Sequence, residues 1–207
     1  MSSAELMAAV MFALVTSITP GPNNAMLMAS GLNFGFVRTL PHIIGISLGF
    51  PIMLMAVGLG FGGLFDAWPI LHRILGILGA IYLLYLAWQI ARAGSIEIDA
   101  HNAAQPMTIF EAAIFQWVNP KAWIVATGAV AVLLKPESFE FGLVVLAILY
   151  GIINLPCVAL WAAGGDVIGR ALTQPRQRRI FNILMAALLV VSVLLPLFMS
   201  WSGPFAR

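Results

Sequence analysis

The stretch SITPGPNNAM, residues 17–26, interrupts an uncharged, mostly apolar run that extends from Leu6 to Val37. It places two prolines, a glycine and two asparagines where the middle of a membrane helix is expected. Proline lacks an N–H group and clashes with the carbonyl four residues back, so the helix must break here. Hydrocarbon cannot hydrogen-bond the freed backbone groups, so they must face protein or a water-filled cavity. The stretch therefore indicates a buried site rather than a surface turn.

The composition places the chain in the membrane class. Of its 207 residues, 61% are hydrophobic and only 9% are charged, whereas soluble domains carry about 25% charged residues. The net charge of +2 and the lack of a basic, aromatic-rich face give no support for nucleic-acid binding. A single cysteine, Cys157, excludes an intramolecular disulfide or a CxxC pair, and three widely separated histidines do not suggest a metal site. We expect no cofactor.

Six apolar segments are long enough to cross a bilayer as helices. They cover roughly residues 5–30, 40–64, 69–91, 108–134, 141–165 and 180–201. The runs are continuously apolar rather than alternating, so the predicted fold class is an all-α integral membrane protein in the lipid bilayer. No Lys or Arg precedes the first run, so we interpret it as a retained helix and not as a signal peptide.

The basic residues predict how the six spans are oriented. One side of the membrane would hold six of them: Arg38, Arg92, Arg170, Arg176, Arg178 and Arg179. The other side would hold three, which are Arg73, Lys135 and Arg207, together with both termini. The positive-inside rule makes the side with six cytoplasmic, so both termini are predicted on the outer side.

The two halves of the chain resemble each other in three places, in the same order. The matches are RILGILGA (73–80) with RIFNILMA (179–186), GISLGFP (45–51) with GIINLP (151–156), and Thr19-Pro20 with Asn119-Pro120. Three spans in each half predict inverted repeats, about 1–95 and about 108–207, joined by a linker at about 92–107 within one transporter domain, 1–207. The alternative is a six-helix protein without internal symmetry.

Both breaks combine freed backbone with polar side chains. Each proline is expected to free the carbonyl four residues earlier, which gives Thr16, Ile18 and Gln116. The N–H end of the following half-helix carries a positive partial charge that suits a carboxylate. Simple proline kinks are the alternative. The predicted substrate-binding residues are Thr19, Pro20, Gly21, Pro22, Asn23, Asn24, Gln116, Asn119, Pro120, Lys121 and Asn154.

Lys121 is the most informative single residue, because a lysine inside a membrane span is costly and usually functional. It could bind a substrate carboxylate as a cation or exchange a proton. The alternative is that its stem reaches an interface. Lys121 lies about 20 Å into its span at 1.5 Å per residue, which is too deep for that stem, although a span that begins at Ala112 would reduce the depth to about 14 Å.

The remaining polar residues have simpler interpretations. Asn154 with Pro156 indicates either an irregularity in the fifth span or a helix-packing contact, and Asn182 has the same two interpretations. The carboxylates near span ends, Glu111, Asp66 and Asp166, are expected to be solvated, and His42 is expected at the interface. The pairs Gly45–Gly49 and Gly58–Gly62 have the GxxxG spacing of close helix packing.

Three motifs resemble the LysE/RhtB translocator family, and the resemblance covers nearly the whole chain. They are TPGPNN (19–24), GAIYLLYLAWQIARA (79–93) and QWVNPKAW (116–123). The resemblance implies a carrier of the bacterial inner membrane, not an enzyme, that exports amino acids or related small metabolites by proton-driven antiport. No acidic residue lies deep within a span, so Lys121, Glu111 and Asp166 are the candidate proton carriers, in that order.

The leading interpretation is a secondary exporter of amino acids or similar zwitterions that works by alternating access of the two repeats around a central site. A channel or an exporter for another small solute or ion is the main alternative. A thiol-relay oxidoreductase would need two cysteines, and a scaffold would have no use for broken helices. The sequence leaves open whether the protein is a homo-oligomer.

Overall fold

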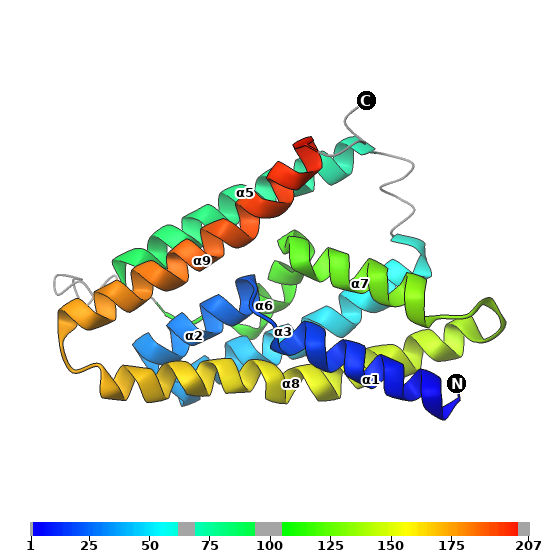
Figure 1. The fold of residues 1–207 in the computed structure, drawn as a ribbon, viewed down its shortest axis with the longest axis horizontal. Helices are drawn as coiled ribbons and strands as arrows, with labels where there is room; N and C mark the ends of the chain where they lie inside the picture. The colour runs from blue at the N-terminus through cyan, green and yellow to red at the C-terminus, as the bar shows by residue number, and fades with distance from the viewer. Residues whose placement is uncertain (1, 62–68, 94–104, 203–207) are drawn as a thin grey trace.

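The computed structural model describes residues 2–61, 69–93 and 105–202, and every regular element in these ranges is a helix (Figure 1). This confirms the predicted all-helical class. The elements are α1 (Ser3–Ile18), α2 (Pro22–Phe34), α3 (Phe36–Ala56), the π-helix η1 (Val57–Phe61), α5 (Pro69–Arg92), α6 (Ile109–Phe115), the 3₁₀ turn η2 (Gln116–Val118), α7 (Pro120–Leu133), the 3₁₀ turn η3 (Pro136–Ser138), α8 (Phe139–Ala171) and α9 (Pro175–Ser202).

Two of these helical stretches are long and apolar enough to cross a membrane, by length and composition. They are Phe36–Gly60 and Pro136–Ala171. Helices α1 and α2 form a third candidate as a pair bent by 53°. Shorter apolar helices run over Gly76–Arg92, Ile109–Val118 and Pro120–Leu133. The described residues therefore contain two or three candidate spans, and the six-span arrangement stays a prediction.

The first break falls where the prolines predicted it. Helix α1 ends at Ile18, and α2 begins at Pro22 with Gly21 as its N-cap. Proline is favoured at the first position of a helix, because its missing N–H would have no partner there anyway and its φ is already helical. The same residues that end α1 therefore start α2 in a new direction, and the bend places both helix ends in the interior of the protein.

The second break has the same logic. A capping box of Thr108 and Glu111 begins α6, and the short η2 turn follows it. Asn119 then adopts an extended backbone, and its side-chain Oδ1 accepts a hydrogen bond of 3.1 Å from the Lys121 N–H. Pro120 occupies the first position of α7. An asparagine cap followed by proline strongly favours the start of a helix, so the local sequence also determines this break.

Helix boundaries differ from prediction at two places. Helix α2 extends to Phe34 and ends at Gly35, whose φ of +83° favours glycine. In the predicted fifth span, α8 runs without interruption through Pro156, so the irregularity predicted there is wrong and the packing interpretation remains. Helix α8 continues through this proline because only one backbone hydrogen bond is lost there.

Glycines set the closest helix contacts. A Cβ on Gly31 of α2 would lie 2.0 Å from the Ala162 carbonyl oxygen of α8, and one on Gly165 would lie 2.1 Å from the Met28 carbonyl oxygen. Cβ atoms on Gly45 and Gly49 of α3 would lie 2.4 and 2.5 Å from backbone atoms of α6, which confirms the predicted packing role of that pair. Gly62 of the second predicted pair lies outside the described residues.

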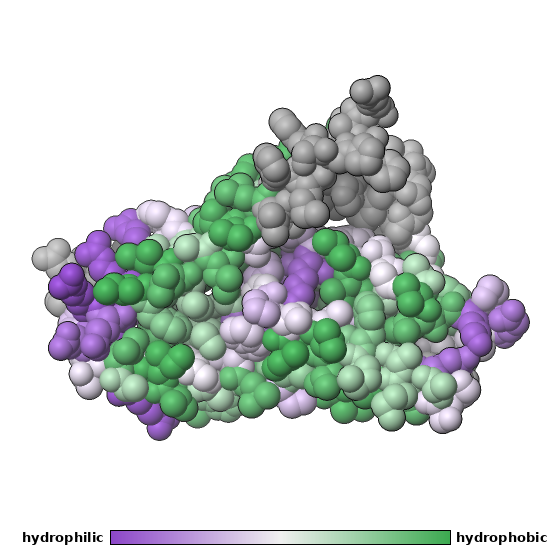
Figure 2. All heavy atoms as spheres, viewed as in Figure 1, coloured by the Kyte–Doolittle hydropathy of each residue, from purple (hydrophilic) through white to green (hydrophobic). Residues whose placement is uncertain are grey.

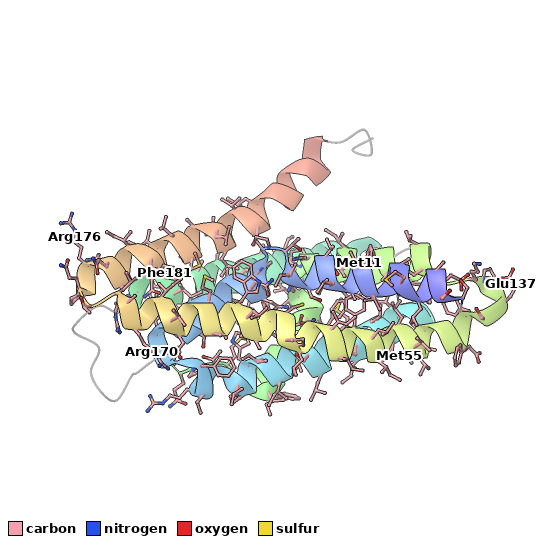
Figure 3. All side chains as sticks on the ribbon, turned by 60° about the horizontal axis from the view of Figure 1, so that its bottom comes forward. Met11, Met55, Glu137, Arg170, Arg176 and Phe181 are labelled. Atoms are coloured by element: carbon pink, nitrogen blue, oxygen red, sulfur yellow. The ribbon has the colours of Figure 1, made fainter. Side chains whose placement is uncertain are left out.

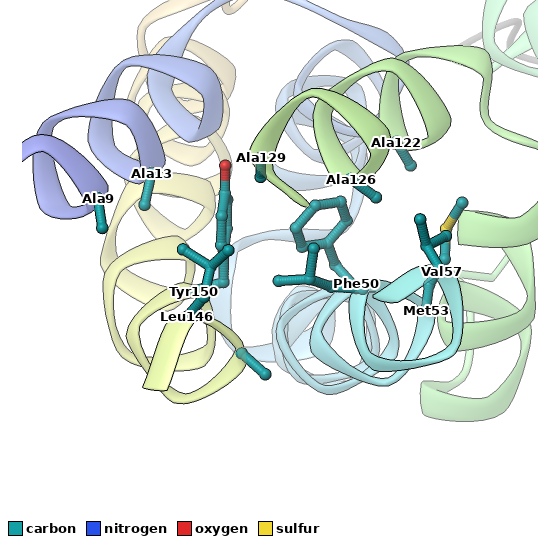
Figure 4. Close-up of a cluster of buried hydrophobic side chains, with 12 residues drawn as sticks. Ala9, Ala13, Phe50, Met53, Val57, Ala122, Ala126, Ala129, Leu146 and Tyr150 are labelled. Atoms are coloured by element: carbon teal, nitrogen blue, oxygen red, sulfur yellow. The ribbon is translucent and has the colours of Figure 1, made fainter. Parts of the chain in front are cut away.

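The buried cluster below the first break brings four helices together (Figure 4). The rings of Phe50 on α3 and Tyr150 on α8 lie 4.8 Å apart between centroids. Small alanines of α1 and α7 face them, so both helices can approach α3 and α8 closely. The alanines are Ala9, Ala13, Ala122, Ala126 and Ala129. This packing fixes the positions of the two breaks, which lie at the inner ends of α1 and α7.

On the face drawn in Figure 2, hydrophilic residues gather at the two ends, and the middle is mostly apolar apart from a smaller hydrophilic patch at its centre. Figure 3 shows Glu137 at one end of the molecule and Arg170 and Arg176 at the other. Large apolar side chains are exposed between these ends, such as Ile52 and Leu160, which are 61% and 64% exposed. This is the surface that a lipid environment favours, because charged groups gather where water is available.

Candidate substrate-binding site

A polar cavity of about 40 Å³ lies between the two breaks. Gly21, Asn23 and Asn24 reach it from the first break, and Asn119 and Lys121 reach it from the second. Its other lining residues are Thr16, Ser17, Phe50, Ala122, Val125, Tyr150, Asn154 and Val158. The structure therefore brings the two sequence motifs to the walls of one cavity.

The Lys121 ammonium group joins the second break to the first. Its Nζ donates to the Thr19 carbonyl at 2.8 Å, to Thr19 Oγ1 at 2.9 Å and to the Pro20 carbonyl at 3.3 Å. An ammonium group has three donors, so all three have partners. The side chain points into the protein, and the alternative in which it reaches a membrane interface is wrong.

The carbonyls that the prolines were expected to free have partners inside the protein. The Thr16 carbonyl accepts from Thr19 Oγ1 at 3.1 Å, and the Ile18 carbonyl accepts from Trp161 Nε1 at 3.1 Å. The Gln116 carbonyl accepts from the Asn119 N–H at 3.3 Å. The carbonyls that meet the cation are instead those of Thr19 and Pro20, one or two residues further along. Which carbonyls accept from the Lys121 ammonium group depends on the direction in which α2 leaves the break.

Asn24 stabilises the first break from within. Its side chain is 3% exposed, and its Nδ2 donates to the Ser17 carbonyl at 2.9 Å and to the Thr19 carbonyl at 2.8 Å. Both carbonyls belong to the irregular segment, where helical partners are missing. Asn24 therefore forms part of the cavity wall, with its amide donor already engaged.

Asn23 and Gln116 form a reciprocal amide pair between the two breaks. Asn23 Nδ2 donates to Gln116 Oε1 at 2.9 Å, and Gln116 Nε2 donates back to Asn23 Oδ1 at 3.3 Å. Gln116 is fully buried, and its Nε2 also donates to the Ala112 carbonyl at 2.8 Å. Together with Lys121, this pair makes two independent polar links across 93 and about a hundred residues of sequence.

Pro20 and Pro22 lie on the side of the first break that faces away from the central cavity. Pro20 and Pro22 line a groove of about 300 Å³ against α9, and Gly21 and Lys121 line both this groove and the central cavity. A Cβ on Gly21 would lie 2.6 Å from the Lys121 Cδ, so glycine leaves room for the lysine to pass. Pro120 sits at the start of α7 and lines neither space.

Asn154 brings an unused acceptor to the cavity. Its Oδ1 is buried and has no hydrogen-bond partner in the part of the chain that the structure describes. The nearby Tyr150 Oη is hydrogen-bonded to Thr16 Oγ1 at 3.0 Å. Sequence reasoning missed Tyr150 and the side chain of Thr16, of which it had singled out only the carbonyl. The available signal was spacing, because residues four apart such as Tyr150 and Asn154 share one face of a helix.

The other polar residues have partners within the protein; Glu111 is exposed as expected, whereas the Asp166 side chain is only 15% exposed. Glu111 accepts from the Thr108 N–H at 2.8 Å in an exposed capping box, and Asp166 pairs with Arg170 at 2.6 Å. Asn182 forms a packing contact with Asn33, with mutual hydrogen bonds of 2.9 and 3.0 Å.

The positions predicted for Asp66 and His42 remain to be compared with the structure. Asp66 lies outside the described residues. The interfacial position predicted for His42 is wrong, because this side chain is 2% exposed and lies between helices.

The fold and the cavity define an all-helical membrane protein with a polar space between two broken helices. The chain belongs to the LysE type translocator family, whose family model matches residues 14–196. It is 32% identical over 185 residues to the cysteine/O-acetylserine efflux proteins of Escherichia coli (strain K12) and Shigella sonnei (strain Ss046), and 30% identical to that of Salmonella typhimurium (strain LT2). Each alignment covers 86% of this chain and 90% of the relative.

No solved structure matches the chain. The family match confirms the resemblance seen in the motifs, and it establishes a multi-pass membrane transporter rather than an enzyme.

Proposed function

We propose that this protein exports small zwitterionic amino acids or their close derivatives across the bacterial cytoplasmic membrane, as a proton-driven secondary transporter. The observation that carries this proposal is the position of the Lys121 ammonium group. Its nitrogen lies 2.8 Å from the Thr19 carbonyl oxygen, inside a polar cavity between two helix breaks. The relatives named as cysteine/O-acetylserine efflux proteins make those two compounds the first solutes to test.

The cavity favours a zwitterion for an electrostatic reason. The carboxylate of an incoming amino acid would pair with Lys121 and with the N-terminal end of α2, where the first N–H groups lack helical acceptors. Its ammonium group would then take the Thr19 and Pro20 carbonyls that Lys121 now occupies. A simple anion would leave those carbonyls without a donor, and a simple cation would be repelled by Lys121. Only a solute that carries both charges replaces every contact.

The packing supports two inverted repeats within a single domain of six spans. Both halves of the first broken span, α1 and α2, pack on α8, and both halves of the second, α6 and α7, pack on α3. Helices α5 and α9, the third span of each half, pack along each other (Figure 1). Each broken span therefore lies against the second span of the opposite half. Rocking of one half against the other would open the cavity to each side in turn, with both termini outside.

Counterflow in proteoliposomes tests this function. Vesicles loaded with unlabelled O-acetylserine should accumulate labelled O-acetylserine transiently, and protein-free vesicles should not. Lys121→Ala and Asn23→Ala should lose this accumulation, whereas Lys135→Ala, which changes an exposed lysine, should keep it.

Three outcomes of that experiment would count against the proposal. Counterflow that survives both site substitutions would place the site elsewhere. Flux that rises linearly without saturation would favour a channel. Wild-type protein without flux of cysteine, O-acetylserine or other amino acids would refute the export function.

A further inference from the structure

His42 is an ionisable residue inside an apolar helix bundle, and the substrate-binding site does not use it. Its side chain on α3 is 2% exposed, and neither ring nitrogen has a hydrogen-bond partner among the described residues. Burying a polar group without a partner costs free energy, and ionisable residues within membrane segments usually mark a pathway or a proton relay. A packing role alone does not account for the two imidazole nitrogens that have no partner among the described residues.

A second cavity of about 80 Å³ lies beside this histidine. Four polar side chains share its walls with His42, namely Ser30, Asn33, Gln89 and Gln105. The remaining lining residues are Met26, Ala29, Phe34, Leu86, Ile90, Ala93, Pro106 and Met107. The space is mostly apolar, but its polar side chains and its volume allow it to hold water molecules, which could pair with both imidazole nitrogens. None of its lining residues lines the central cavity.

The groups around His42 leave its protonation free to change. Helices α2 and α5 contribute only uncharged side chains to the cavity. Helix α6, which packs on α3, carries Glu111 outside the cavity lining, and this carboxylate interacts with His42 electrostatically. Helix α8, which also packs on α3, carries Asp166 and Arg170 as an ion pair with each other. Lys121 at the start of α7 lines the other cavity.

The three residues first considered as proton carriers are already engaged. Glu111 is hydrogen-bonded to Thr108, Asp166 forms an ion pair with Arg170, and Lys121 donates hydrogen bonds to carbonyl oxygens. His42 has an unused donor and an unused acceptor next to a hydratable space. One helix, α2, connects the two cavities, because its first residues line the central one and its last turns line the second.

We propose that His42 and its cavity form a proton-binding site, separate from the solute site, that carries the proton coupled to export. The inference rests on the proposed function above. The imidazole nitrogen accepts a proton from hydronium in the cavity when the cavity opens to one side, which leaves water, and it returns the proton to water as hydronium when the cavity opens to the other. The movement of α2 that admits or releases solute changes the access of water to His42.

Separating exchange from proton-driven transport tests the role of His42. Counterflow of O-acetylserine exchanges one solute for another without net proton movement, whereas uptake driven by a pH gradient requires it. His42→Gln, which cannot carry a proton but still hydrogen-bonds, should retain counterflow and lose gradient-driven accumulation. The matched control is His72→Gln, which lies on α5 about 20 Å along the helix from the nearest cavity residue and should retain both.

The outcomes separate this inference from the proposed function. Wild-type protein without counterflow would refute the function itself. Gradient-driven accumulation that survives in His42→Gln would overturn the role of His42, and so would an equal loss of both activities, which indicates a structural defect.

A spectroscopic measurement on the unaltered protein guards against a variant that fails to fold. In nanodiscs, the ¹⁵N signals of the His42 ring, assigned by their loss in His42→Gln, should change from the neutral to the protonated form as the pH is lowered. Adding O-acetylserine should move that transition, because linkage is reciprocal. Signals that change with neither pH nor solute would overturn the inference.

Discussion

The reciprocal amide pair of Asn23 and Gln116 allows a quantitative test of the link between the two breaks. Asn23→Ala leaves Gln116 Oε1 buried without its donor, and Gln116→Ala leaves the Asn23 amide without both of its bonds to Gln116. Each single substitution should cost about 1–3 kcal/mol of unfolding free energy, the range for an unsatisfied buried polar group. The double variant should cost less than the sum, because it leaves no half of the pair behind.

The size of that difference follows from the geometry. One hydrogen bond is 2.9 Å long and the other 3.3 Å, so we count one full bond and one weaker bond. The coupling energy should be about 1–2 kcal/mol, which is at the high end for polar contacts between membrane helices. Denaturant titration in mixed micelles would measure it for the wild type, both single variants and the double variant.

A swapped pair provides the control. Asn23→Gln combined with Gln116→Asn keeps the combined length of the two side chains, and it should be more stable than either alanine variant. The reasoning is refuted if the two alanine substitutions add within about 0.5 kcal/mol, because additivity at that level indicates independent sites.

Two further predictions concern helix contact and the cavity. Gly165→Ala should lower the Tm and cost about 1–3 kcal/mol, because its Cβ would lie 2.1 Å from a carbonyl oxygen, whereas Gly128→Ala, whose nearest atom is 3.9 Å away, should not. Equal Tm values for the two would show that α2 and α8 do not pack this closely. Asn154→Leu should weaken solute binding without lowering the Tm, since its Oδ1 has no partner in the described structure, and Asn182→Leu should lower the Tm because Asn33 loses its partner. A stability loss for Asn154→Leu alone would contradict its assignment to the cavity.

The sequence predicted the two helix breaks well, because their causes are local. Pro20, Pro22 and Pro120 cannot continue a helix, and an asparagine or glycine before a proline starts the next one. The same local reasoning failed at Pro156, where α8 continues. A single proline leaves one missing hydrogen bond, which neighbouring helices can compensate. A capping residue directly before the proline, as at Gly21 and Asn119, was therefore the useful signal, and Pro156 lacks one.

The partners of the freed groups could not be predicted, because they depend on how helices cross. Trp161 takes the Ile18 carbonyl only because α8 passes beside the first break. Lys121 was predicted to be functional from its depth, but its hydrogen bonds to Thr19 and Pro20 could not be predicted, because they need the two breaks to meet. His42 was misplaced for the same reason, since its burial comes from helices that are distant in sequence.

Direct solute binding tests the central claim that the two broken helices form the solute site. Equilibrium dialysis of labelled O-acetylserine against the purified protein would compare the wild type with Lys121→Met and Lys135→Met, the only two lysines in the chain. We predict saturable binding that Lys121→Met weakens by about 10- to 100-fold, the value of a hydrogen bond to a charged group, and that Lys135→Met leaves unchanged. Wild-type affinity in Lys121→Met would contradict the account.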